Sequence, residues 1–219
     1  MHHAIEPAIH YWGTPVVLVS SLDADGSTNL APMSSAWWLG WSCMLGLDAS
    51  SATVANLRRD GRCVLNLPSQ EQDAHVNALA LTTGSVELPL HKRMLDYRHV
   101  ADKFAAAGLT RAAHTTDGHP RAALECPVHL EGEVVAITPF GTADPRLGVP
   151  VVAVEVRLTR VMVDERLSTP GRPDRIDAEA WHPLLMSFRH LYGRGGRRAP
   201  SVLASGPEEA YAPWKFARA

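Results

Sequence analysis

The chain has 219 residues, 46% apolar and 20% charged, so it can bury a sizeable core and does not have the composition of a disordered protein. Its 21 Lys and Arg against 23 Asp and Glu give a net charge of −2, which offers nucleic acid no overall attraction and leaves any anion site to local geometry. Three cysteines without C-x-x-C spacing, and an N-terminus without the apolar core of a signal peptide, predict reduced thiols in a cytoplasmic protein.

Strands and turns alternate through the first third of the chain. Residues 16–19 are β-branched or apolar and predict a strand, and the turn formers at 23–26 follow it. A second extended segment covers 28–36, where Pro32 cannot donate to a ladder and so marks a sheet edge or a kink. These two segments predict a β-hairpin, and residues 43–47 predict a third strand.

A short helix is expected over residues 52–60, with Ser50 or Ser51 as its N-cap and Gly61 at its end. A strand is expected next at 63–67, followed by helices at 72–81 and 92–107 and by strands at 128–137 and 151–163. A linker at 169–175, a last helix at 178–192 and a tail at 193–219 complete the chain. Early strands with inserted helices do not match a doubly wound sheet, so an antiparallel barrel with helices at its edges is expected.

The start of the predicted helix offers a cradle for an anion. Ser50, Ser51 and Thr53 place hydroxyls at or before its first turn, and Asn56 follows one turn later. Backbone N–H groups at a helix start have no partner inside the helix, and the helix dipole adds positive charge there. A phosphate fits such a start. Ordinary helix capping explains the same residues.

The segment 29–36 contains mostly small residues, which let a flat ring lie close to the backbone. Ser34 and Ser35 point to opposite faces of the strand, so one of them faces a ligand in either register. An edge strand with polar residues facing water is the competing interpretation.

Taken in order, several segments resemble the flavin reductase-like family, which consists of FMN-binding split barrels and includes the reductase components of two-component monooxygenases. The resemblance covers roughly residues 12–192 and is carried by segments 15–21, 29–35, 48–56, 61–67, 125–131 and 183–193. It implies a mainly β, antiparallel Greek-key-like split barrel. It also implies a homodimer that binds FMN, with FAD less favoured as the cofactor. The flavin would take a hydride from NADH or NADPH, and the reduced flavin would supply a partner oxygenase.

The resemblance also implies site residues. Asn29 and Ala31 lie on the ring-lining strand, Pro32, Met33, Ser34 and Ser35 would line the flavin ring, and Ser50, Ser51, Thr53 and Asn56 would hold the phosphate. Further candidates are Asn66, Arg189 and Tyr192, the last two from either subunit. No protein side chain acts as a catalyst and no metal is expected, because the flavin carries the chemistry. The expected organisation is an extension at 1–11, a barrel at 12–167, and a helix and tail at 168–219 that pack on the barrel or the partner.

Alternatives remain at this stage. The chain could hold FMN but exchange electrons with a protein and not with a nicotinamide, or its barrel could bind another ligand such as haem, although hydroxyls suit a phosphate better than haem. Trp37, Trp38 and Trp41 fit a dimer interface, a pocket wall or a core. His129 and Glu131 share a strand face and form a weak metal candidate.

Overall fold

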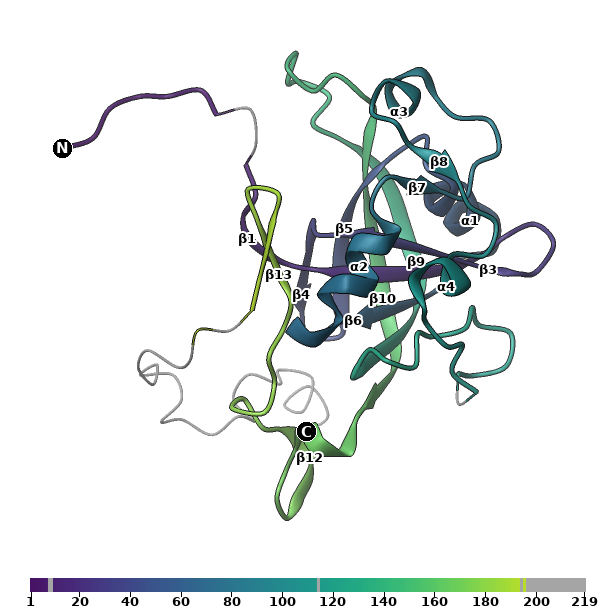
Figure 1. Cartoon of the computed structure of the whole chain (residues 1–219), viewed down its shortest axis with the longest axis vertical. Helices are drawn as coiled ribbons and strands as arrows, with labels where there is room; N and C mark the ends of the chain where they lie inside the picture. Colours follow the sequence, from purple (N-terminus) through teal and green to yellow (C-terminus); the bar gives the residue numbers. More distant parts are fainter. Residues whose placement is uncertain (8–9, 114, 194, 196–219) are drawn as a thin grey trace, which may run out of the picture.

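The structure is a computed structural model that describes residues 1–7, 10–113, 115–193 and 195 (Figure 1). Its main feature is a seven-stranded antiparallel sheet with strand order β3-β2-β6-β9-β10-β5-β4. The strands are β2 (Val17–Leu22), β3 (Thr28–Met33), β4 (Ala36–Leu39), β5 (Ser42–Asp48), β6 (Arg62–Leu67), β9 (Val128–Phe140) and β10 (Val151–Val163). Each predicted strand is therefore present.

The sheet curls into a barrel around an apolar interior. Val17 and Val19 of β2 point into that interior together with Leu65 and Val154, as the two-residue period of a strand requires. The two edge strands, β3 and β4, are joined directly through Ser34 and Ser35, and the Gly46 amide of β5 donates to the Ser35 carbonyl at 2.7 Å. This short connection brings the two sheet edges together.

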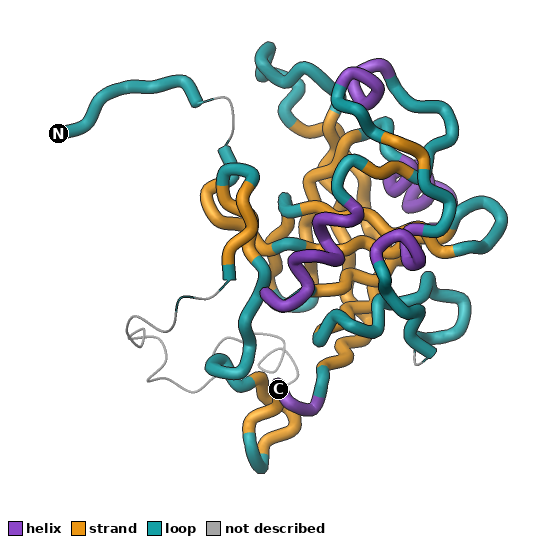
Figure 2. The backbone as a smooth tube through the Cα atoms, in the orientation of Figure 1, coloured by secondary structure: helices purple, strands orange, loops and turns teal. Residues whose placement is uncertain are grey.

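Helices cover one outer face of the barrel, as Figure 2 shows. Leu18 and Leu30 point outward from β2 and β3 and form a second apolar cluster with Val76, Leu79 and Phe104. These last three residues come from α2 (Asp73–Leu79) and α4 (Lys103–Ala107), and the 3-10 turn η1 (Gln70–Gln72) leads into α2. Both faces of β2 are thus buried, which explains why its sequence is apolar without alternation.

Helix α1 (Ala52–Asp60) has the predicted limits. The Ser51 hydroxyl accepts a hydrogen bond from the Val54 amide at 3.2 Å, which confirms Ser51 as the N-cap. Gly61 ends the helix with a φ of 81°, a left-handed conformation that glycine adopts without steric cost.

The single helix expected over 92–107 is wrong. The structure contains two short helices there, α3 (Leu90–Met94) and α4, with β8 (Arg98–His99) between them. The backbone of Asp96 has a φ of 58°, which no helix allows, and β8 pairs in parallel with β7 (Thr82–Thr83). The chain between β7 and α4 therefore loops out and returns beside β7.

The helix expected over 178–192 is also wrong. These residues include β13 (Leu185–Ser187) and β14 (His190–Tyr192), which form a small sheet with β1 (Trp12–Pro15). Pro183 lacks the amide hydrogen that a helix interior needs and disfavours helical geometry at the residue before it. Met186 and Leu191 instead pack against the second apolar cluster.

The linker expected over 169–175 contains a small hairpin of β11 (Ser168–Thr169) and β12 (Arg172–Ile176), preceded by the turn η2 (Glu165–Leu167). All three cysteines are free and buried. Within the described ranges, no helix combines the length and apolarity needed to cross a bilayer. Most of the predicted tail, residues 196–219, lies outside the described residues.

Candidate functional site

A cavity of about 520 Å³ lies against the outer face of the barrel. Its walls come from β3 and the connection to β4, from the start of α1, from the end of α2 with β7, and from the β13–β14 hairpin. In Figure 1, the β1–β13–β14 sheet lies on the opposite side of α2 from α1. The cavity therefore extends between these two groups of elements, and its volume is in the range of small-molecule and cofactor sites.

One wall is the predicted ring-lining segment. Ala31, Pro32, Met33, Ser34 and Ser35 all line the cavity. Strand β3 pairs with β2 and lies at the edge of the main sheet. Its uncharged residues and small side chains give this wall a surface against which a flat ring can lie. Asn29 of the same strand is not among the lining residues, and its Nδ2 donates to Thr53 Oγ1 at 3.4 Å.

The start of α1 forms the second wall, through Ser51, Ala52 and Thr53. Because Ser51 caps only the Val54 amide, the amides of Ala52 and Thr53 have no partner within the helix. Gly84 passes close by, since a Cβ on Gly84 would lie 2.7 Å from Asn29 Oδ1 and 3.2 Å from the Ala52 Cβ. A larger residue at position 84 would collide with this wall.

Three predicted site residues hold the fold together and do not line the cavity. Ser50 Oγ donates to Asp48 Oδ1 at 2.7 Å. Asn56 Nδ2 donates to Ser21 Oγ at 3.1 Å and to Asp23 Oδ1 at 2.8 Å, and so ties α1 to the β2–β3 hairpin. Asn66 Nδ2 donates to the Leu18 carbonyl at 2.7 Å, and its Oδ1 accepts from the Ala123 amide at 2.8 Å.

The cavity is lined by two buried lysines that the sequence analysis does not predict as site residues. Lys103 is only 2% exposed and forms no hydrogen bond or ion pair with the described residues, although it lines the cavity. Burial lowers the pKa of its ammonium to about 8, and repulsion by Lys92 contributes, while Asp23 acts in the opposite direction. A lysine in an otherwise apolar helical pattern, between Asp102 and Phe104, was the available signal.

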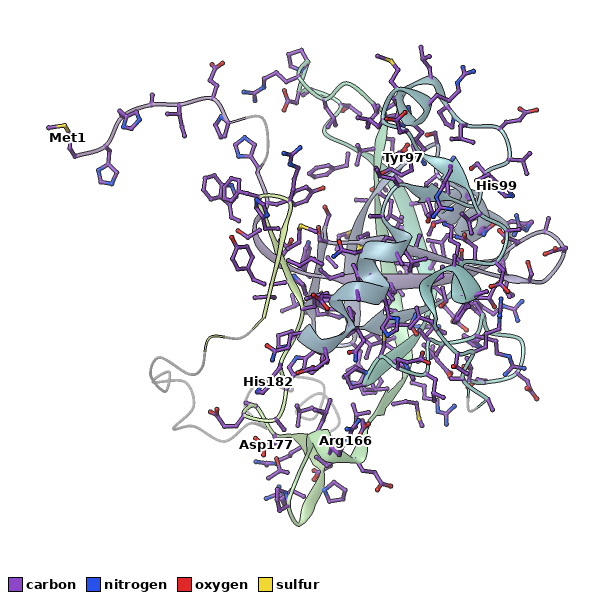
Figure 3. The ribbon with its side chains drawn as sticks, in the orientation of Figure 1. Met1, Tyr97, His99, Arg166, Asp177 and His182 are labelled. Carbon is purple, nitrogen blue, oxygen red and sulfur yellow. The ribbon has the colours of Figure 1, made fainter. Side chains whose placement is uncertain are left out.

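Lys92 is 8% exposed and is neutralised by Asp48, with 3.2 Å between Lys92 Nζ and Asp48 Oδ2. His91 Nε2 lies 3.0 Å from the same carboxylate oxygen. Burial raises the pKa of Asp48, but hydrogen bonds from Ser50 and His91 and the charge of Lys92 outweigh it and lower that pKa to about 2. Asp48 is therefore ionised and paired, and Lys103 remains as the unpaired charge on this side. Tyr97, which follows α3 and is labelled in Figure 3, also lines the cavity.

The β13–β14 hairpin lines the other side of the cavity through Met186, Arg189 and Leu191, together with Tyr11. Arg189 thus lines the cavity of its own chain, whereas Tyr192 is exposed and is not among the lining residues. Phe188 and Arg189 both have positive φ values, of 44° and 69°.

The remaining candidates have structural partners. His129 Nε2 lies 2.7 Å from the Ala123 carbonyl oxygen, and Glu131 accepts from the amide and hydroxyl of Thr116. No group of three His, Cys, Asp or Glu side chains suited to a metal ion occurs in the part of the chain that the structure describes. Trp38 packs against the barrel core, while Trp37 and Trp41 are exposed.

Comparison with known proteins agrees with this architecture. The family model described as "Flavin reductase like domain" matches residues 9–193. The uncharacterised protein YdfE of Bacillus subtilis (strain 168) is 32% identical over 191 residues, which cover 87% of this chain and 88% of YdfE.

Two solved structures illustrate the shared fold. Flavoredoxin of Desulfovibrio vulgaris (Miyazaki F) superimposes with a TM-score of 0.72 at 19% identity, covering 94% of this chain and all of flavoredoxin. Nitrilotriacetate monooxygenase component B from Bacillus cereus gives a TM-score of 0.69 at 18% identity, covering 91% of this chain and 99% of that one. At this identity the likeness concerns the fold, and it confirms the predicted split β-barrel.

Proposed function

Since the chain belongs to the flavin reductase-like family, we propose that it binds FMN in the cavity and works as a flavin reductase that takes a hydride from NADH or NADPH. The observation that carries the proposal is the pairing of an uncharged strand wall with a buried, unpaired Lys103 in one cavity. That pairing suits a ligand with a flat, neutral ring and a single anionic end.

The donors fit the phosphate of FMN. Lys103 supplies a buried positive charge that forms no ion pair with a described residue, although the charge of Asp23 attracts it, and the amides of Ala52 and Thr53 point out of a helix start. The hydroxyls of Ser51 and Thr53 add hydrogen-bonding capacity. FMN fits this set better than FAD, because Lys92 is already paired with Asp48 and the remaining donors, Lys103 and the start of α1, suit a single anionic end.

The residues at 31–35 would then lie along the ring. When bound, the flavin supplies the redox chemistry, since it accepts a hydride and passes electrons on. The chain's own residues hold the phosphate, shape one side of the ring site and leave the hairpin side for a second molecule. Orientation and contact are the main contributions that such a reaction needs from the protein.

Two finer points belong to the same proposal. Trp37, Leu39 and Trp41, which we call the tryptophan face, alternate along the edge strand β4 and the turn after it, and are 57%, 76% and 46% exposed. Large apolar residues on one exposed face are typical of interfaces, so we propose a homodimer through this face. We also propose a cytoplasmic setting and a partner oxygenase that consumes reduced flavin.

Anaerobic titration in visible light tests the function. Purified protein mixed with FMN should bind it at micromolar concentration, and addition of NADH or NADPH should then bleach the flavin absorption. A protein that takes up no FMN would overturn the proposal.

A second candidate is supported by the likeness to flavoredoxin. In that case the chain holds FMN and exchanges electrons with a protein partner. The distinguishing result is a yellow protein that stays yellow with both nicotinamides but is bleached by dithionite.

A further inference from the structure

We propose that Arg189 determines specificity for the hydride donor by binding a phosphate of the nicotinamide dinucleotide at the hairpin side of the cavity. The inference rests on the proposed function and extends it, because it names how the second substrate is recognised. Three observations on the described residues support it.

The first is the distribution of charge. Lys103, the start of α1 and Arg189 all line the cavity. In Figure 1, α1 and α4, which carries Lys103, lie on one side of α2, and the β13–β14 hairpin, which carries Arg189, lies on the other. FMN has one phosphate, and Lys103 with the α1 start is the better site for it. The positive charge of Arg189 is then left for an anion from another molecule.

The second is the backbone of the hairpin. Phe188 and Arg189 form a two-residue turn in which both φ values are positive, a geometry for which Asn-Gly is the usual sequence. Such a conformation costs free energy for residues with a Cβ and persists where the surroundings impose it. The Phe188 ring packs edge-on against Trp12, with 4.6 Å between ring centroids, and so helps to hold the turn. Leu81, another non-glycine residue with positive φ, also lines the cavity.

The third is that Arg189 is exposed and forms no hydrogen bond or ion pair with any described residue. A guanidinium binds phosphate through two parallel hydrogen bonds, which a lysine cannot reproduce. In the proposed site, residues 31–35 lie along the ring and the hairpin lines the side left for a second molecule. A nicotinamide dinucleotide carries a pyrophosphate next to its reacting portion, so the turn places a phosphate-binding group on the side where the donor would bind.

The test compares Arg189→Gln with Arg172→Gln, which removes the same charge from the exposed hairpin β11–β12. Flavin reduction is followed by anaerobic stopped flow with NADH, with NADPH and with 1-benzyl-1,4-dihydronicotinamide, which has the same reducing ring but no phosphate. Arg189→Gln should raise the concentration of dinucleotide needed for half-maximal reduction at least tenfold, as expected for a lost charge-assisted hydrogen bond. Reduction by the benzyl compound and FMN affinity should change less than twofold.

Several results would overturn the inference. An equal loss with the benzyl compound would mean that Arg189 acts on the flavin or on the fold, and a loss of FMN affinity would make Arg189 a flavin ligand. Unchanged dinucleotide kinetics, or the same change in Arg172→Gln, would remove its role altogether. The FMN titration of the wild-type protein separates these results from failure of the proposed function, because that titration contains no nicotinamide.

Discussion

Lys103 is the most informative single residue in this structure, because its buried charge lowers the stability of the folded protein when no ligand is bound. Its pKa falls from an ordinary 10.5 to about 8 on burial. Each pKa unit corresponds to about 1.4 kcal/mol, so keeping this ammonium charged in the folded protein costs roughly 3 kcal/mol. A buried charge of this kind is usually paired. An anionic ligand would supply the missing partner.

The variant Lys103→Met should therefore separate stability from binding. Without the buried charge, the free energy of unfolding of the ligand-free protein at pH 7 should rise by about 1–3 kcal/mol. FMN affinity should fall at least tenfold, since a hydrogen bond to a charged group is worth about 1.5–3 kcal/mol. Urea denaturation and FMN titration measure the two effects. Lys92→Met is the matched control and should lower stability, because it leaves Asp48 with one partner fewer.

The same residue predicts a pH dependence. The pKa of Lys103 is lower in the folded than in the unfolded protein, so between about pH 8 and 10.5 the unfolded chain binds more protons. The stability contribution of this residue to the ligand-free protein therefore increases as pH rises through that interval. FMN affinity should do the reverse and decline above about pH 8, as Lys103 loses its charge. Titrations at pH 7 and pH 9.5 should show this decline in the wild type, and an equal decline in Lys103→Met would contradict it.

Among the elements, α1 shows what sequence reasoning can and cannot supply. Its limits and its cap followed from Ser51 and Gly61, because capping depends on local chemistry. The role of Asn56 did not follow, because it depends on which side of the helix meets the β2–β3 hairpin, and only the tertiary structure fixes that. Strand β13 does not follow from the sequence for a related reason, because its partner β1 lies more than 160 residues away in the chain and no local pattern reports that pairing. Strand β14 pairs with β13 through the turn Phe188-Arg189, which lacks the Asn and Gly typical of two-residue hairpin turns.

Helix α1 also supports a paired substitution. Thr53 lines the cavity one turn before Asn56, which faces the barrel and bonds Ser21 and Asp23. Thr53→Val should weaken FMN binding about tenfold, while Asn56→Ala should lower the free energy of unfolding by about 1–3 kcal/mol, as for a buried amide hydrogen-bond network, with FMN affinity within twofold. Thermal unfolding and FMN titration of both variants test this. Weaker FMN binding by Asn56→Ala without a loss of stability would support the sequence-based prediction that Asn56 binds the phosphate.

At the scale of the whole molecule, the cavity combines residues that the chain separates widely. Tyr11 and Leu191 lie at its ends in sequence, and Ser34, Ser51, Thr83 and Lys103 lie between them. The overall net charge of −2 carried no information about this site, because Asp48 offsets Lys92 and leaves Lys103 and Arg189 as local positive charges. The strand order of the barrel was equally inaccessible to sequence reasoning, since β6 pairs with β9 and β5 pairs with β10. Composition and local sequence patterns therefore indicate the fold class, whereas the position of the site depends on strand pairing between distant parts of the chain.

The tryptophan face gives the last prediction, on assembly. Trp37 and Leu39 alternate on β4, so their side chains share the outer face while Trp38 turns into the core. Strand β4 is also an edge of the main sheet and contacts β1, so this apolar surface continues toward the small sheet that carries Arg189.

Sedimentation velocity should show a dimer for the wild type and a folded monomer for the double variant Trp37→Glu and Trp41→Glu, because charged residues are disfavoured in interface cores. The control Leu95→Glu changes an exposed apolar residue just after α3 and should remain dimeric. A monomeric wild type, or a dimeric tryptophan variant, would place assembly elsewhere or exclude it.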